Sequence, residues 1–178
     1  IDNWILRETD GIVKFANEKY AVYDFHNPTT KLRNFLWETF ASNYVELVKR
    51  RAYNEDGAFS KESQQGALYA LNMVLKCMLE VLAPINPMIC EKLYSDLFDE
   101  DVHAQSFPTS VGFKDVEFSR DDLMEANAAV WKFKKDNFIP LKEGVAKVSL
   151  PCNLQGVIAD FKAMHSISEV VEGDLHVE

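Results

Sequence analysis

The sequence predicts a mainly α fold, an antiparallel helical bundle followed by a small α+β C-terminal lobe. Residues 28–51 and 60–82 repeat apolar side chains at three- and four-residue steps, which is the spacing of one helix face. Short connections between such helices favour antiparallel neighbours. Near the C-terminus, residues 145–150 alternate apolar and polar side chains and stop at Pro151, a pattern typical of a strand.

The first hundred residues contain four helical patterns. The first extends from about Asp2 to Tyr20. We expect the second to begin with Asn27 as its capping residue and Pro28 at its first helical position, and to end at Arg51. Its apolar stripe comprises Leu32, Phe35, Leu36, Phe40, Tyr44, Leu47 and Val48.

The third helix is expected to begin near Ser60 and to end before Pro84. Pro84 can stand at the start of the fourth helix, with Pro87 still inside its first turn. Nearly all of the third helix's apolar stripe should be buried, namely Leu68, Leu71, Val74, Leu75, Met78, Leu79 and Leu82. Residues 99–118 are acidic and aperiodic, which predicts a linker that crosses back over the bundle.

We place the domain boundary so that residues 1–110 form the bundle and residues 111–178 form the lobe. Ser119 and Asp122 have the spacing of a capping box, so a fifth helix should begin there and end near Phe138. The other elements expected in the lobe are the strand, a short helix and two extended stretches, at residues 145–150, 154–164, 168–171 and 175–177.

Composition and spacing bear on several classes of protein. No run approaches the roughly 18 apolar residues of a membrane span. The three cysteines have neither disulfide nor zinc-ligand spacing, which indicates reduced, mostly buried thiols and a cytoplasmic protein. The four histidines lack partners at ligand spacing, and the seven glycines form no phosphate-binding loop. We therefore expect no catalytic residue, cofactor site or metal site in these residues.

The charge is unevenly distributed along the chain. The net charge is −9, whereas residues 1–55 hold eight Lys/Arg and eight Asp/Glu and therefore sum to zero. A polyanion would accordingly dock on the first third of the chain. Lys49, Arg50 and Arg51 follow one another at the end of the second helix. Cations of this kind neutralise phosphates, but they also complement a helix dipole, so both roles stay open.

Aromatic residues lie near these cations. Tyr53 follows them, and Trp37 and Tyr44 precede them on the second helix. Aromatic rings can stack on unpaired bases. We nevertheless expect Trp37 and Tyr44 to brace the interior of the bundle. A second basic-aromatic cluster, residues 131–135, is explained equally well by a helix surface.

Three segments resemble class I aminoacyl-tRNA synthetases of the valyl, isoleucyl and leucyl group. Residues 2–6 match the Asp-x-Trp-Ile-Leu opening of the first anticodon-domain helix. Residues 34–49 are similar to the second helix, and residues 79–94 follow the pattern Leu-x-x-Leu-x-Pro-x-x-Pro-x-Ile-x-Glu-x-Leu-Tyr. The resemblance implies a helical bundle that binds the anticodon stem-loop of a tRNA.

The later residues, from Val130 past Pro140, are similar to the short tail of archaeal-type valyl enzymes, although Phe107 departs from a Ser-Trp-Pro pattern of the family. The chain begins in mid-helix and ends without a coiled-coil tail, so we expect a C-terminal fragment of the valyl branch. An isoleucyl or leucyl fragment, or a helical protein-interaction module with no RNA role, is the alternative.

The resemblance places both ATP-site signatures of the family upstream of this chain. The parent chain would then be a ligase that joins valine to its tRNA with ATP and Mg²⁺, whereas these residues would be non-catalytic. Their partners would be the tRNA and the catalytic domain of the same chain. The residues expected to contact phosphates are Lys49, Arg50 and Arg51. Those expected to contact or stack on bases are Asn43, Glu46 and Tyr53.

Overall fold

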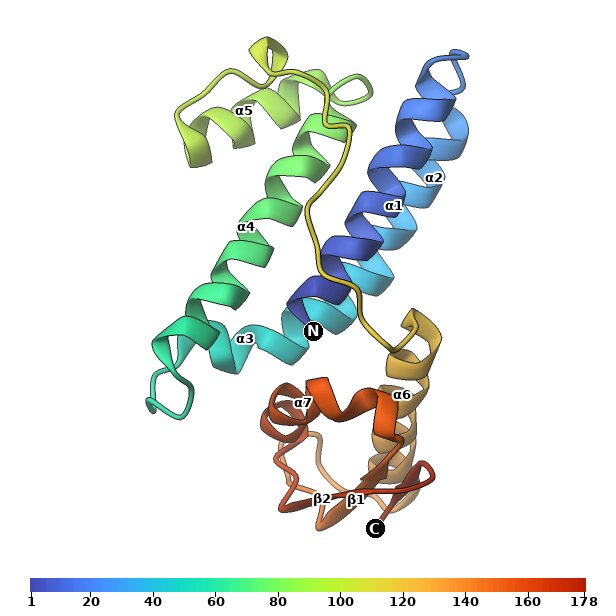
Figure 1. Ribbon diagram of the computed structural model, residues 1–178, viewed down its shortest axis with the longest axis vertical. Helices are drawn as coiled ribbons and strands as arrows, with labels where there is room; N and C mark the ends of the chain where they lie inside the picture. The colour runs from blue at the N-terminus through green and yellow to red at the C-terminus, as the bar shows by residue number, and fades with distance from the viewer. The chain divides into compact units, whose positions relative to one another are not determined.

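The computed structural model describes residues 1–178 and confirms the mainly α fold with a small sheet (Figure 1). The helices are α1 (Asp2–Tyr20), α2 (His26–Asn34), the π-helical segment η1 (Phe35–Val45), α3 (Glu46–Tyr53), α4 (Lys61–Leu82), α5 (Pro87–Phe98), the 3-10 turn η2 (Val102–Ala104), α6 (Arg120–Asp136), the 3-10 turn η3 (Cys152–Val157) and α7 (Ile158–His165). The strands are β1 (Lys147–Leu150), β2 (Glu169–Glu172) and β3 (His176–Val177). None of the helices combines the length and the hydropathy that a membrane span requires.

Two compact units, each discontinuous in sequence, make up the chain. The helical unit comprises residues 2–42 and 66–115, and the mixed unit comprises residue 1 and residues 43–65 and 116–178. The helical unit holds α1, α2, α5 and most of α4, whereas the mixed unit holds α3, α6, α7 and the sheet. This grouping by contact differs from a boundary at residue 110. The boundary at residue 110 stays a prediction.

The helical unit is built on amphipathic faces. Along α1 the buried apolar side chains are Trp4, Ile5, Leu6, Ile12, Val13 and Ala16. Along α4 the buried face is displaced from the predicted stripe, because Leu68 is 48% exposed while Ala67, Ala70 and Val81 are fully buried. Small side chains let neighbouring backbones approach closely. The prediction followed side-chain size and therefore misplaced part of this face.

The start of the second helix also differs from the prediction. The capping position of α2 is Phe25, and Asn27 already lies in the first turn. The Asp24 carboxylate takes the capping role, since its Oδ1 accepts a hydrogen bond from the Asn27 backbone N–H at 3.1 Å. Pro28 lies buried in that first turn, where a proline is tolerated because its missing N–H would have no helical partner.

The π-helical segment η1 changes which side chains of the second helix are buried. A π-helix pairs residues five apart, as the Ser42 hydroxyl does when it donates to the Trp37 carbonyl at 2.8 Å. The Phe35 and Phe40 rings, also five residues apart, stack with centroids 6.4 Å apart. Trp37 is 75% exposed. The expectation that Trp37 braces the interior is therefore wrong, whereas Tyr44 is fully buried as expected.

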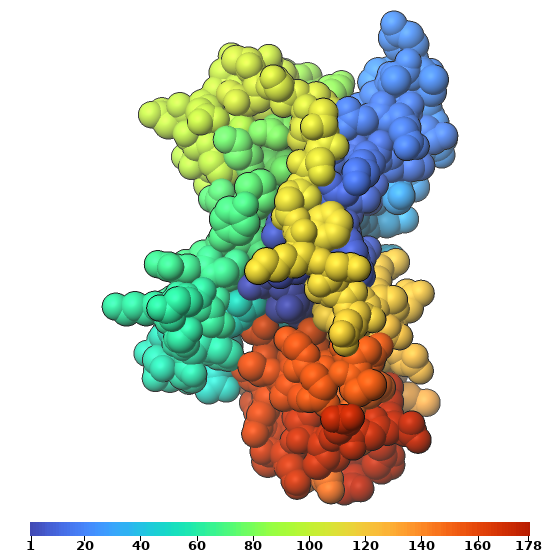
Figure 2. Space-filling view, in the orientation of Figure 1, coloured from blue at the N-terminus to red at the C-terminus, as the bar shows by residue number.

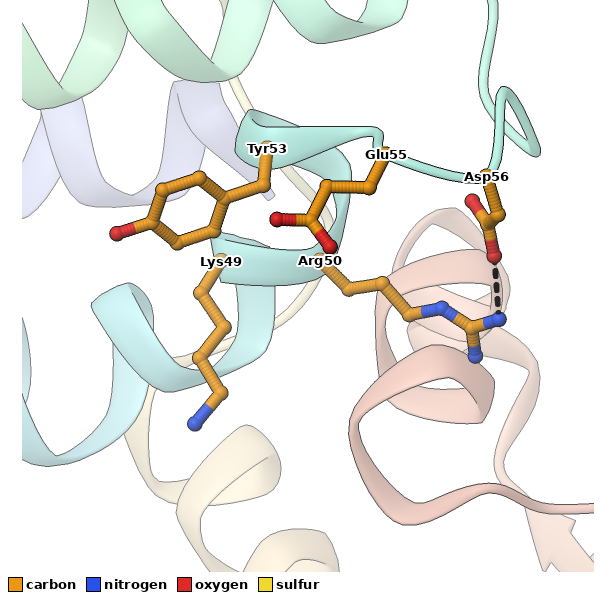
Figure 3. A pocket seen from close by; sticks show the side chains of 5 residues that line it. All are labelled: Lys49, Arg50, Tyr53, Glu55 and Asp56. Atoms are coloured by element: carbon orange, nitrogen blue, oxygen red, sulfur yellow. Dashed lines mark hydrogen bonds and ion pairs between the residues drawn. The ribbon is translucent and has the colours of Figure 1, made fainter.

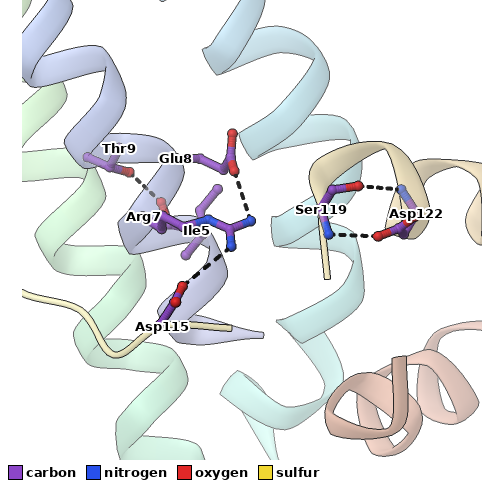
Figure 4. A network of polar contacts seen from close by, with 7 residues as sticks. All are labelled: Ile5, Arg7, Glu8, Thr9, Asp115, Ser119 and Asp122. Atoms are coloured by element: carbon purple, nitrogen blue, oxygen red, sulfur yellow. Dashed lines mark hydrogen bonds and ion pairs between the residues drawn. The ribbon is translucent and has the colours of Figure 1, made fainter. Parts of the chain in front are cut away.

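Residues 105–115 follow the predicted path back along the helical unit, but they are held in place (Figure 2). The Asp10 carboxylate of α1 accepts hydrogen bonds from the Ser110 hydroxyl and the Val111 N–H, each at 2.8 Å. Asn17 Nδ2 donates to the Pro108 carbonyl at 2.7 Å, and Asn3 Oδ1 accepts from the Lys114 N–H at 2.9 Å. Arg7 adds a longer ion pair to Asp115 (Figure 4). The segment is therefore a strap along α1.

Replacing Asp10 with Ala is expected to release this strap and to lower the free energy of unfolding by about 2–3 kcal/mol, since several hydrogen bonds to a buried charge disappear together. Trypsin should then cut after Lys114 much faster, while cleavage after Lys61 in the other unit should keep its rate. Rapid cleavage after Lys114 in the unaltered protein would contradict the strap.

The same carboxyl makes the strap sensitive to acid. Burial opposes ionisation of Asp10, but the hydrogen bonds from Lys14, Val111 and Ser110 outweigh it and hold its pKa below the ordinary value. Because the pKa of Asp10 is lower in the folded state, this carboxyl stabilises the fold at pH values above its unfolded-state pKa of about 3.9. That contribution is lost as the pH falls through the folded-state pKa.

The mixed unit has its own core. Its three strands are ordered β2-β1-β3, with β1 parallel to β2 and antiparallel to β3. Helix α6 begins with the predicted capping box, in which Ser119 and Asp122 each accept a hydrogen bond from the other's backbone N–H (Figure 4). Fully buried apolar side chains fill the unit, among them Leu123, Val130, Val148, Leu150, Leu154 and Phe161.

Candidate nucleic-acid interface

Helix α3 and the loop after it present the predicted cations. The helix ends at Asn54, whose left-handed backbone (φ 48°) stops the helix while its N–H donates to the Arg50 carbonyl. The Asn54 side chain then binds Phe59 twice, accepting from its N–H at 3.0 Å and donating to its carbonyl at 2.9 Å. Gly57 supplies a second left-handed position, with φ 65°. The loop from residue 54 to residue 59 therefore has a fixed shape.

A surface pocket of about 370 Å³ lies where α3 meets this loop (Figure 3). It is lined by Lys49, Arg50, Tyr53, Glu55 and Asp56. The Tyr53 side chain is 74% exposed, so its ring is open to contact with another molecule. Three of the six predicted contact residues thus share one pocket, which we call the Tyr53 pocket. No group of three or more His, Cys, Asp or Glu in the chain could hold a metal ion.

Both cations of the Tyr53 pocket take part in exposed ion pairs. Lys49 pairs with Glu46 one turn earlier, and Arg50 pairs with Asp56 of the loop at 2.7 Å. The Arg50 guanidinium, followed by the Ala58 N–H, holds the pKa of Asp56 below its usual range. Exposed pairs contribute little to stability and are screened by salt. An arriving phosphate can therefore replace either carboxylate at small cost.

Arg51, the third predicted phosphate contact, occupies a different position. It is 5% exposed, its Nε donates to the Asp160 carboxylate at 2.8 Å, and its Nη1 donates to the Ser63 carbonyl at 2.8 Å. The guanidinium thus joins α3 to α7 and to the first turn of α4 within the mixed unit. In this arrangement it is not available to a phosphate, because helical rotation turns Arg51 inward while Arg50 stays at the surface.

Asn43 likewise belongs to an internal polar chain. Its Oδ1 accepts from Asn127 Nδ2 at 2.7 Å, and Asn127 Oδ1 contacts His165 Nε2 at 2.8 Å. His165 is fully buried, and burial together with nearby Lys134 lowers its pKa to about 4. The ring is therefore neutral near pH 7, and its Nε2–H donates to Asn127. These hydrogen bonds connect the last residues of η1 with α6 and α7.

The second basic-aromatic cluster is also structural. Lys134 is only 1% exposed and donates to the carbonyls of Leu141, Glu143 and His165 at 3.2, 2.6 and 3.3 Å. Trp131 packs edge-on against the His165 ring, with centroids 4.7 Å apart. The cluster ties α6 to the loop before β1 and to the end of α7.

Sequence reasoning missed four residues at this surface. Glu55 and Asp56 line the Tyr53 pocket, and Phe59 and Lys162 line a neighbouring one. The sequence Asn-Glu-Asp-Gly at residues 54–57 predicts a loop, but it does not predict where the side chains of that loop point. Lys162 comes from a segment more than a hundred residues later, and no pattern in the sequence joins it to α3.

Comparison with known proteins shows the family of this helical fold. Residues 2–150 match the family described as the anticodon-binding domain of tRNA ligase. Because that match covers most of the chain, the chain belongs to this family of anticodon-binding domains.

Among its relatives are archaeal valine--tRNA ligases. The chain is 30% identical to that of Pyrobaculum aerophilum over 97% of its own length and 22% of that protein. It is 29% identical to the enzyme of Aeropyrum pernix over 93% of its length and 21% of that protein. It is 32% identical to the enzyme of Methanosarcina barkeri over 84% of its length and 17% of that protein. The chain thus spans about a fifth of the length of these relatives.

Proposed function

We propose that the chain binds the anticodon stem-loop of a tRNA through the Tyr53 pocket. Lys49 and Arg50 would contact phosphates, and the exposed Tyr53 ring would stack on an unpaired base. Glu46, which pairs with Lys49, would accept a hydrogen bond from a base edge once the cation turns to a phosphate. The observation that carries the proposal is the exposed aromatic ring flanked by two cations, in a chain of this family.

The physical chemistry of an anticodon loop suits this surface. Such a loop carries closely spaced phosphates and bases that are splayed out and unstacked. The Tyr53 pocket offers two cations whose carboxylate partners a phosphate can replace, and a flat apolar ring. It also offers acidic groups that can accept hydrogen bonds from base amino groups. Asn43 and Arg51 would act indirectly, because their buried hydrogen bonds hold together the helices that carry this surface.

The relatives support a choice of tRNA partner. Because the relatives named above are valine--tRNA ligases, we propose a valine tRNA as the partner, and ATP- and Mg²⁺-dependent joining of valine to that tRNA as the activity of the whole protein. The catalytic domain would belong to the same chain, in the cytoplasm. Residues 1–110 would be the anticodon-binding bundle and residues 111–178 an accessory lobe.

The test is the replacement of Tyr53 by Leu. Loss of base stacking should weaken binding of a valine tRNA transcript to the full-length protein by about 1 kcal/mol, or roughly fivefold. The variant Tyr53→Phe keeps the ring and should bind as the unaltered protein does. The melting temperature should not change, because the ring is exposed. Equal affinity for all three proteins would refute a stacking role.

A further inference from the structure

A second pocket lies beside the Tyr53 pocket. It has a volume of about 380 Å³ and is lined by residues of α3, of the following loop and of α7. Arg50 lines both pockets, so this residue is their common border. We call the second one the Lys162 pocket. Figure 3 shows the Arg50 side chain extending away from Tyr53.

Buried contacts fix α7 beside α3 and so give the Lys162 pocket its walls. The buried Arg51–Asp160 ion pair joins α3 and α7 on the side of each helix that faces the protein interior. Arg50 and Lys162, each close in sequence to one member of that pair, stand on the outer side and face the same pocket. Since the Asn54 side chain also holds the loop at Phe59, every wall of this pocket is anchored.

The lining of the Lys162 pocket combines positive charge with apolar side chains. Two cations, Arg50 and Lys162, accompany an aromatic ring, Phe59, and three alanines. Lys162 is the one Lys or Arg among residues 148–178, which otherwise carry five Asp or Glu. In this acidic stretch the single cation, Lys162, lines a largely apolar pocket together with a second cation, Arg50. Such a surface is complementary to a ligand that joins an uncharged flat ring to a negatively charged group.

We propose that the Lys162 pocket holds a second unpaired nucleotide of the same RNA, adjacent to the one at Tyr53. Its base would lie against Phe59 and the alanines, and its phosphate would sit between Lys162 and Arg50. The inference rests on the proposed RNA binding at the Tyr53 pocket and extends it to α7. The lobe then takes part in recognition through Lys162, in addition to its support of α3.

The test measures the affinity of a valine tRNA transcript for the full-length protein over a range of salt concentrations. Replacing Lys162 with Gln should lower the slope of log affinity against log salt by about 0.7–0.9, and should weaken binding about four- to sixfold at 0.15 M salt. Lys162→Arg should keep the slope. Lys142→Gln is the matched control, since Lys142 is exposed in the same unit and lines neither pocket.

Two outcomes separate failure of this inference from failure of the proposed function. If Tyr53→Leu weakens binding while Lys162→Gln leaves both slope and affinity unchanged, the Lys162 pocket does not hold RNA and the inference is overturned. If neither change affects tRNA binding, the proposed function fails together with it. Equal effects of Lys162→Gln and Lys142→Gln would mean general electrostatic attraction and would also overturn the site.

Discussion

Replacing Arg51 with Met is expected to lower the free energy of unfolding by about 3–5 kcal/mol, the usual cost of breaking a buried ion pair. The change leaves the Asp160 carboxylate buried without the guanidinium, and it removes the donor to the Ser63 carbonyl. Both effects loosen α7 and the first turn of α4 from α3. Thermal or chemical denaturation would measure the loss.

The double variant Arg51→Met/Asp160→Leu is the control for this prediction. Because it removes both charges, it should recover much of the lost stability. In the folded Arg51→Met protein, the salt slope of tRNA binding should equal that of the unaltered protein, since Arg51 is not at the surface. A slope that falls while stability holds would instead make Arg51 a phosphate contact.

Much of the fold could be predicted from the sequence because it depends on local signals. The end of α4 before Pro84 and the capping box at Ser119 depend on backbone chemistry within a few residues. The fourth helix begins at Pro87 and not at Pro84, because residues 83–86 form a turn. The π-helical segment could not be predicted in this way. Its spacing of five residues turns Trp37 outward, whereas a regular α-helical period would have placed it with Tyr44.

The candidate site could be predicted in part. Lys49, Arg50 and Tyr53 line one pocket. They lie together because all three belong to the last turns of the same helix, α3. The sequence predicts Arg51 and Asn43 at the same surface, but their partners Asp160 and Asn127 come from distant segments. A run of three cations does not reveal which one turns inward until the packing of α7 is known.

The second large effect is expected from changing Lys49 and Arg50 together to Gln. Because the phosphates would then face no cation at these two positions, tRNA binding should weaken about 15- to 30-fold at 0.15 M salt. Stability should change little, because both cations are exposed and their ion pairs with Glu46 and Asp56 contribute weakly. The loss should therefore appear in binding and not in melting temperature, the reverse of the pattern expected for Arg51→Met.

The salt dependence of tRNA binding by Lys49→Gln/Arg50→Gln, measured beside its melting temperature, tests RNA binding at the Tyr53 pocket most directly. RNA binding there predicts a slope of log affinity against log salt that is smaller by about 1.4–1.8, with an unchanged melting temperature. A dipole role for these cations predicts a lower melting temperature with the slope and the affinity unchanged. That second result would contradict RNA binding at the Tyr53 pocket.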